Sequence, residues 1–275
     1  MTNLSPSAPQ SRPGPIRRVG RFLAAAIGVA LTLTLALPLG AGAAVAPITA
    51  VRTGAETGSQ FATAAYAVKG PIGKRYRKLG GANGRLGPAI SKQKCHKPTG
   101  VCSQRFKRGA IVHDPNAVKK VVAAVGKPAR AAHIALARAY VGYREPKVRG
   151  SKWNKWIGNN NAWCGFFNAW VSRASGNGNA YPKADHHRKQ VAIIRKTGTI
   201  LKRPQRGAFM FINRQGGKRP GHGGLIVKVK KNGDVVTIDG NAPRPKSNTR
   251  KGRRYVVRRS QDTSMAVMYW RPPGW

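Results

Sequence analysis

Cys164 is the residue of this sequence best placed for covalent chemistry. It follows a run of asparagines and precedes bulky residues, with Phe167, Trp170 and Val171 at the spacing of one helix face. Asparagine is a preferred N-cap, and Asn161 in particular predicts that the thiol lies in the first turn of this helix. Free N–H groups and the helix dipole favour a thiolate there. Cys164 is therefore a candidate nucleophile, with core packing and a disulfide as the alternatives.

A thiolate nucleophile needs an imidazole that forms an ion pair with it and later protonates the leaving group. His222 is the best candidate, because it lies between glycines at the start of the apolar run GLIVKV. Asp239 and Asn241 close the next β-branched run, and pairing of the two runs as a hairpin would bring them beside His222. We predict a site in which Asp239 orients the imidazole and Asn241 assists.

The other two cysteines, Cys95 and Cys102, lie in one loop, CHKPTGVC, whose proline and glycine suit a tight turn. They are the natural disulfide pair in an oxidising compartment. Cys164 is then left as an unpaired thiol, and the count alone leaves core packing open as its explanation.

The N-terminal segment predicts export. A basic region holds Arg17 and Arg21, an apolar run covers residues 22–39, and small residues at 43–46 suit a signal peptidase. An uncleaved membrane anchor is the alternative, although the run is at the short end for spanning a bilayer. We expect residues 1–46 to be a signal peptide and the mature protein to be secreted or associated with the cell envelope.

The composition is extremely basic, with 51 Lys+Arg against 7 Asp+Glu and a formal net charge of +44. Such a field attracts polyanions. For an exported protein these are anionic wall polymers and an anionic membrane surface, and no specific nucleic-acid partner is expected. The acids are too few and scattered for a calcium or magnesium site, and the histidines lack zinc spacing with the cysteines. No metal or cofactor is therefore expected.

The chain divides by composition into two folded parts joined by linkers. We expect linkers at 47–68 and 121–128, a compact glycine-punctuated module at 69–120, and a second domain at 129–275. In the second domain helical periodicity comes first and about five short β-branched or aromatic runs follow. This order predicts an α+β fold, with N-terminal helices packed on a mostly antiparallel sheet of about five strands.

The module at 69–120 resembles a single LGFP repeat, a small unit of exported cell-envelope proteins. The matching features are Tyr76 followed by Leu-Gly-Gly, the turn LGPAI at 86–90, and the closing segment from Phe106 to Ile111. The resemblance implies association with the cell envelope. A structural spacer is the alternative, because such repeats usually occur in arrays.

The second domain resembles the CHAP family of cysteine peptidoglycan hydrolases, relatives of NlpC-type peptidases with a reduced papain-like fold. The resemblance covers about 130–275. It rests on five motifs: Ala162-Trp163-Cys164, Gly221-His222-Gly223, Asp239-Gly240-Asn241, the strand segment RPQRGAFMFI, and the terminal Tyr269-Trp270-Arg271-Pro272. The family acid is commonly glutamate, so Asp239 is one methylene shorter. The usual Gly-Asp of the strand segment is Gly207-Ala208 here.

The resemblance implies a hydrolase in which Cys164 attacks an amide carbonyl of peptidoglycan, and we expect the protein to be a monomer. Asn161 and Trp163 are the candidates for positioning the oxyanion or the substrate. Both the muramoyl–L-alanine amide and a peptide cross-link suit such an enzyme. Two alternatives stay open: a non-catalytic basic wall-binding protein with a degenerate CHAP fold, and a nucleic-acid or membrane binder that acts through charge, with tryptophans that stack or insert.

Overall fold

The computed structural model describes residues 66–243 and 252–275, which all fall within one compact unit. The predicted signal peptide at 1–46 and most of the predicted linker at 47–68 lie outside the described residues. Within the described ranges, no helix is both long and apolar enough to cross a bilayer.

The first part of the described chain builds a four-stranded antiparallel sheet in the order β1-β2-β3-β4. Its elements are α1 (Gly70–Arg77), a 3-10 turn (Gly81–Asn83), β1 (Lys94–His96), β2 (Val101–Phe106), β3 (Gly109–His113) and β4 (Val121–Val125). The prediction of a linker at 121–128 is wrong for its first five residues, because the run Val-Val-Ala-Ala-Val pairs with β3. β-branched residues favour a strand when a partner edge is available.

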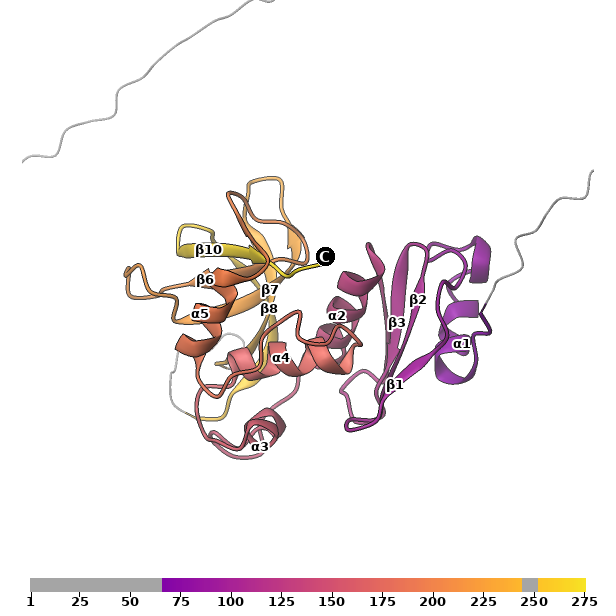
Figure 1. The fold of residues 1–275 in the computed structure, drawn as a ribbon, viewed down its shortest axis with the longest axis horizontal. Helices are drawn as coiled ribbons and strands as arrows, with labels where there is room; N and C mark the ends of the chain where they lie inside the picture. Colours follow the sequence, from indigo (N-terminus) through magenta and orange to yellow (C-terminus); the bar gives the residue numbers. More distant parts are fainter. Residues whose placement is uncertain (1–65, 244–251) are drawn as a thin grey trace, which may run out of the picture. The chain divides into compact units, whose positions relative to one another are not determined.

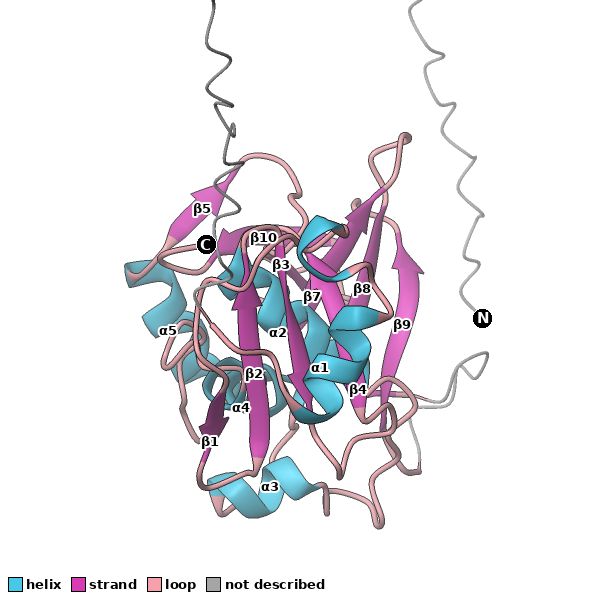
Figure 2. Cartoon of the chain, turned by 90° about the vertical axis from the view of Figure 1, so that its right-hand side faces the viewer, coloured by secondary structure: helices cyan, strands magenta, loops and turns pink. Residues whose placement is uncertain are grey.

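The two faces of this sheet pack against different helices. Phe106 and Ile111 join Ile72 of α1 in a small core, whereas Val101 and Val112 join the large core with α2 (Pro128–Ala139). Figures 1 and 2 show α1 and α2 on opposite faces of the sheet. The first sheet and the second half of the chain therefore share one apolar core.

The second part consists of helices followed by strands, and the predicted α+β class is confirmed (Figure 1). Its six strands form one antiparallel sheet in the order β5-β10-β6-β7-β8-β9. The three-residue β5 was not among the predicted strands, because so short a run carries no readable alternation. The remaining elements are α3 (Lys152–Ile157), α4 (Cys164–Ala174), α5 (His187–Lys196), β5 (Thr199–Leu201), β6 (Phe209–Ile212), β7 (His222–Val229), β8 (Val235–Ala242), β9 (Tyr255–Gln261) and β10 (Ala266–Arg271).

Helix α4 lies close against β7 and β8. A methyl group added at Gly240 of β8 would lie 2.8 Å from Cβ of Phe167, so only glycine allows this approach. Asn168, one turn after Cys164, donates from Nδ2 to the carbonyl oxygen of Gly223 at 3.5 Å. These two contacts hold the start of α4 beside the start of β7.

The predicted disulfide between Cys95 and Cys102 is confirmed. The two residues are directly opposite each other in the β1–β2 hairpin. Cys164 is a free, buried thiol.

His133 on α2 is completely buried between Phe209 and Trp275, and no described group bonds to either of its ring nitrogens. Burial lowers its pKa to about 3, against an ordinary value near 6.5. The unfolded chain therefore binds a proton below pH 6.5 that the folded protein excludes until about pH 3, so stability falls with acidification across this window.

We expect His133→Phe to remove this pH dependence, because phenylalanine fills the same space without a titrating group. One pKa unit corresponds to about 1.4 kcal/mol, so the wild type should lose about 2 kcal/mol more than the variant between pH 7 and pH 5. Urea unfolding of both proteins at the two pH values measures the difference. Parallel losses would show that His133 is not the titrating group.

Candidate active site

Cys164 occupies the first position of α4, as predicted, but Asn161 does not cap the helix. The N-cap residue is Trp163, which provides no side-chain cap. Asn161 is exposed, and its side-chain amide donates to the carbonyl oxygen of Asp185 at 3.2 Å. The asparagine run forms a local turn, in which the N–H of Asn161 bonds Oδ1 of Asn159, and the Asn161 side chain is engaged with Asp185 rather than with the helix.

The prediction that Trp163 positions the substrate is wrong, because its side chain is completely buried. The indole stacks on Trp153 with ring centroids 4.8 Å apart, and its Nε1 donates to Oε2 of Glu145 at 2.8 Å. Glu145 is itself buried and accepts the backbone N–H of Arg254 through Oε1. Trp163 therefore anchors the residue next to the nucleophile to the core.

The structure brings His222 and Asp239 beside Cys164. Nε2 of His222 lies 3.4 Å from Oδ2 of Asp239, and the imidazole also interacts with the thiol of Cys164. The 3.4 Å contact is long and not aligned as a hydrogen bond. Catalytic contacts of this kind are often loose in substrate-free enzymes and tighten in the complex.

The β7–β8 register explains this placement. Leu225 pairs with Ile238, so the next positions, Gly224 and Asp239, face each other, and His222 is the diagonal neighbour of Asp239. A methyl group on Gly224 would lie 2.1 Å from Oδ1 of Asp239. The second glycine after the histidine thus makes room for the carboxylate.

Asn241 is not brought to the imidazole. It has a positive φ of 57°, and the β8–β9 ladder is irregular between Asp239 and Ala242. Within the described part of the chain no hydrogen bond joins Asn241 to His222. This bulge in β8 interrupts the regular alternation that the predicted hairpin would have required.

Two residues of β9 that sequence reasoning missed also hold the carboxylate. Nε of Arg259 lies 2.9 Å from Oδ2 of Asp239, and Nε2 of Gln261 donates to the same oxygen at 3.1 Å. Gln261 also donates to Oγ1 of Thr237 at 2.7 Å. Only the pairing of β8 with β9 creates these contacts, and no local pattern in YVVRRSQ identifies them.

The electrostatics of the three residues favour a thiolate–imidazolium pair. Burial raises the pKa of Cys164, but His222 and the N–H groups of Gly165 and Gly223 outweigh it, so the thiol pKa lies below its ordinary value. Burial lowers the pKa of His222, whereas Asp239 and the thiol raise it to about 9. The pKa of Asp239 is lowered despite its burial, by His222 first and then Arg259, so the carboxylate is ionised at neutral pH.

The first turn of α4 offers N–H groups to a substrate oxygen. The first intrahelical bond runs from the N–H of Phe167 to the carbonyl of Trp163, and no described side chain caps the turn. Unpaired N–H groups at a helix N-terminus stabilise a developing oxyanion. Gln190 of α5, fully buried, packs so closely on Gly165 that an added methyl group would lie 1.7 Å from its Oε1.

An open cleft leads away from the imidazole. A cavity of about 240 Å³ is lined by His222 and the 212–215 segment, and an adjoining one of about 900 Å³ lies between α5 and the 213–221 loop. The second cavity has six basic or imidazole residues and, among the described residues that line it, no acid: His186, His187, Arg188, Arg195, Lys218 and Arg219. The cleft suits an extended, negatively charged ligand.

Gly224→Ala is expected to lower activity by at least about 10²-fold, because the new methyl group must displace the buried carboxylate of Asp239. Hydrolysis rates and circular dichroism of the purified variant measure the effect and check the fold. If the variant acts through Asp239, combining it with Asp239→Asn should add little further loss. Fully additive losses would contradict this route.

In the described residues, no group of three His, Cys, Asp or Glu side chains is arranged to hold a metal ion. Comparison with known proteins found no match among family models, curated proteins or solved structures.

Proposed function

We propose that the protein is an exported peptidoglycan hydrolase that cleaves an amide bond with Cys164 as nucleophile, on a CHAP-like, reduced papain-like fold. One observation carries the proposal: a thiol with a lowered pKa, at a helix N-terminus, beside an imidazole whose Nε2 faces a buried carboxylate. A cysteine that is buried only for packing requires neither an adjacent imidazole nor a carboxylate behind it. The motif resemblance supplies the substrate class.

The chemistry follows from these positions. The thiolate of Cys164 attacks the amide carbonyl carbon, and the N–H groups of the first turn of α4 stabilise the oxyanion. His222 then gives its proton to the amide nitrogen, the C–N bond breaks, and the amine leaves behind a thioester. A water molecule gives a proton to His222 and attacks the thioester, which releases the carboxylic acid and restores the thiolate. Asp239 keeps the imidazole oriented and stabilises its positive charge.

Two further features support an anionic wall substrate. The stem peptides of peptidoglycan carry carboxylates, and the cleft beside His222 is lined by basic residues. The net charge of +44 favours association with the anionic cell envelope.

Digestion of purified peptidoglycan tests the proposal. We expect soluble fragments, and their masses identify whether the muramoyl–L-alanine amide or a peptide cross-link has been cut. A preparation that binds peptidoglycan but releases no fragment and no new amino group at any pH from 5 to 9 (a window spanning about the ordinary pKa range of His and Cys) would instead support the non-catalytic wall-binding protein.

A further inference from the structure

Arginines from four parts of the chain converge beside α2, away from the cysteine site. We call Arg85, Arg130, Arg138, Arg206 and Arg258 the arginine row. A methyl group added at Gly126 would lie 2.9 Å from Nη1 of Arg206 and 3.8 Å from Nη2 of Arg130, so these two guanidinium groups meet at one point. Arg138 is close enough to Arg206 for its charge to help lower the pKa of Arg206. Arg258 has the same effect on the pKa of Arg138.

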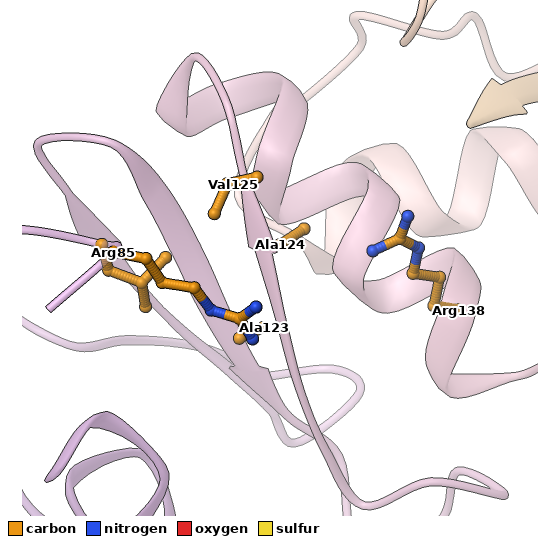
Figure 3. Close-up of a pocket in the computed structure, with 6 residues that line it drawn as sticks. Arg85, Ala123, Ala124, Val125 and Arg138 are labelled. Atoms are coloured by element: carbon orange, nitrogen blue, oxygen red, sulfur yellow. The ribbon is translucent and has the colours of Figure 1, made fainter. Parts of the chain in front are cut away.

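One end of the row borders a small cavity. Arg85 and Arg138 line about 70 Å³ together with residues 123–125 of β4. Figure 3 shows the two guanidinium groups directed toward β4 from either side of the strand. β4 is the edge strand of its sheet, so Arg85 and Arg138 flank an edge that no described strand covers.

The row has no counter-charge among the described residues. Six of the seven acids are described, and each has its partners elsewhere: Asp114 with Tyr140, Glu145 with Trp163, Asp185 with Lys189, Asp234 with Lys230, Asp239 with His222 and Arg259, and Asp262 with Ser264. Nε of Arg130 is buried without a described partner. Burial is the main cause that lowers the pKa of Arg130, Arg138 and Arg206, and repulsion by neighbouring arginines adds to it.

Partly buried like charges without a counter-ion destabilise a fold, and a bound anion relieves both the burial and the repulsion. Guanidinium groups match phosphate in planar, two-pronged hydrogen bonds. Arg130 and Arg138 are eight residues apart on α2, or about 12 Å along the axis, which exceeds the reach of a single phosphate.

We propose that the arginine row binds consecutive phosphate groups of a polyanion. This site is separate from the cysteine site, because Arg258 and the carboxylate-binding Arg259 are neighbours on β9, and alternation along a strand directs them to opposite faces. The proposal does not depend on the hydrolase activity.

Calorimetric titration of the wild-type protein with tripolyphosphate, orthophosphate and citrate tests the site, at an ionic strength of about 0.15 M to screen diffuse attraction. Tripolyphosphate should bind at least about 10-fold more tightly than the other two, a difference of about 1.4 kcal/mol. Equal binding of citrate would overturn the proposal, since it would show that the row does not require phosphate groups.

Matched double variants locate the binding. Arg130→Gln/Arg138→Gln should weaken tripolyphosphate binding by at least about 10-fold, while Arg77→Gln/Arg149→Gln, with the same loss of charge at exposed positions outside the cleft, should change it less than about 2-fold. Equal weakening would overturn the site. Arg206→Gln is the substitute if the first double variant does not fold.

Two competitors then identify the source of the phosphates. Displacement of tripolyphosphate by a soluble glycerol-phosphate polymer would identify a polymer ligand, and displacement by phosphatidylglycerol vesicles would identify lipid headgroups. Failure of both to compete would overturn a polyanion ligand.

Discussion

Replacement of Cys164 by alanine is expected to abolish hydrolysis of peptidoglycan, with a loss of at least about 10⁴-fold, because Cys164 is the one free thiol among the described residues. The alanine fits, since the thiol is only 2% exposed and the change removes one atom. Binding to whole walls should survive, because loss of the thiolate changes the charge of this strongly basic protein by no more than a single unit. Release of new amino groups measures activity, and sedimentation with purified walls measures binding.

Alkylation with iodoacetamide gives an independent measure of the same thiol. Because the pKa of Cys164 is lowered and that of His222 is raised to about 9, the ion pair exists between the two values. Activity should therefore rise as the thiol ionises below its ordinary pKa and fall as His222 loses its proton near pH 9. Alkylation of the native protein should be faster at neutral pH than that of the denatured chain. Equal rates would indicate a degenerate, non-catalytic site.

The second large effect concerns the residue that orients His222. Asp239→Asn should lower kcat by about 10³- to 10⁴-fold, because an amide can present the wrong hydrogen-bonding group to the ring. Asn241→Ala should cost less than about 10-fold, because no hydrogen bond joins Asn241 to the imidazole in the described part of the chain, whereas Asp239 lies within 3.4 Å of it. Steady-state kinetics on a soluble muropeptide measure both variants.

The pH profile separates orientation from simple loss of folding. Without the carboxylate, the pKa of His222 should fall, because Asp239 is the first of the groups that raise it. The alkaline limb of the Asp239→Asn profile should therefore move to lower pH. If Asn241→Ala is far worse than Asp239→Asn, the orienting role belongs to Asn241.

Local patterns were sufficient for the features that depend on neighbours in the chain. The apolar spacing after Cys164 predicted α4. The asparagine run predicted that the thiol lies in its first turn, which is correct although Asn161 does not cap the helix. The β-branched runs predicted five of the six strands of the second sheet. The short loop between Cys95 and Cys102 predicted the disulfide, because a seven-residue separation leaves few other partners. Each of these features requires only periodicity or proximity along the sequence.

The tertiary structure decided everything that depends on register and burial. Trp163 is an anchor and not a substrate contact, because Trp153 and Glu145 enclose its ring from segments that no periodicity connects. Asp239 rather than Asn241 faces His222, because a bulge in β8 interrupts the alternation on which the hairpin argument relied. Arg259 and Gln261 join the site only because β9 pairs with β8 across a connection whose sequence carries no sign of that register. Sequence alone thus determined which groups are chemically competent. Long-range packing determined which of them meet, because a shift of one residue in a strand reverses the face on which a side chain lies.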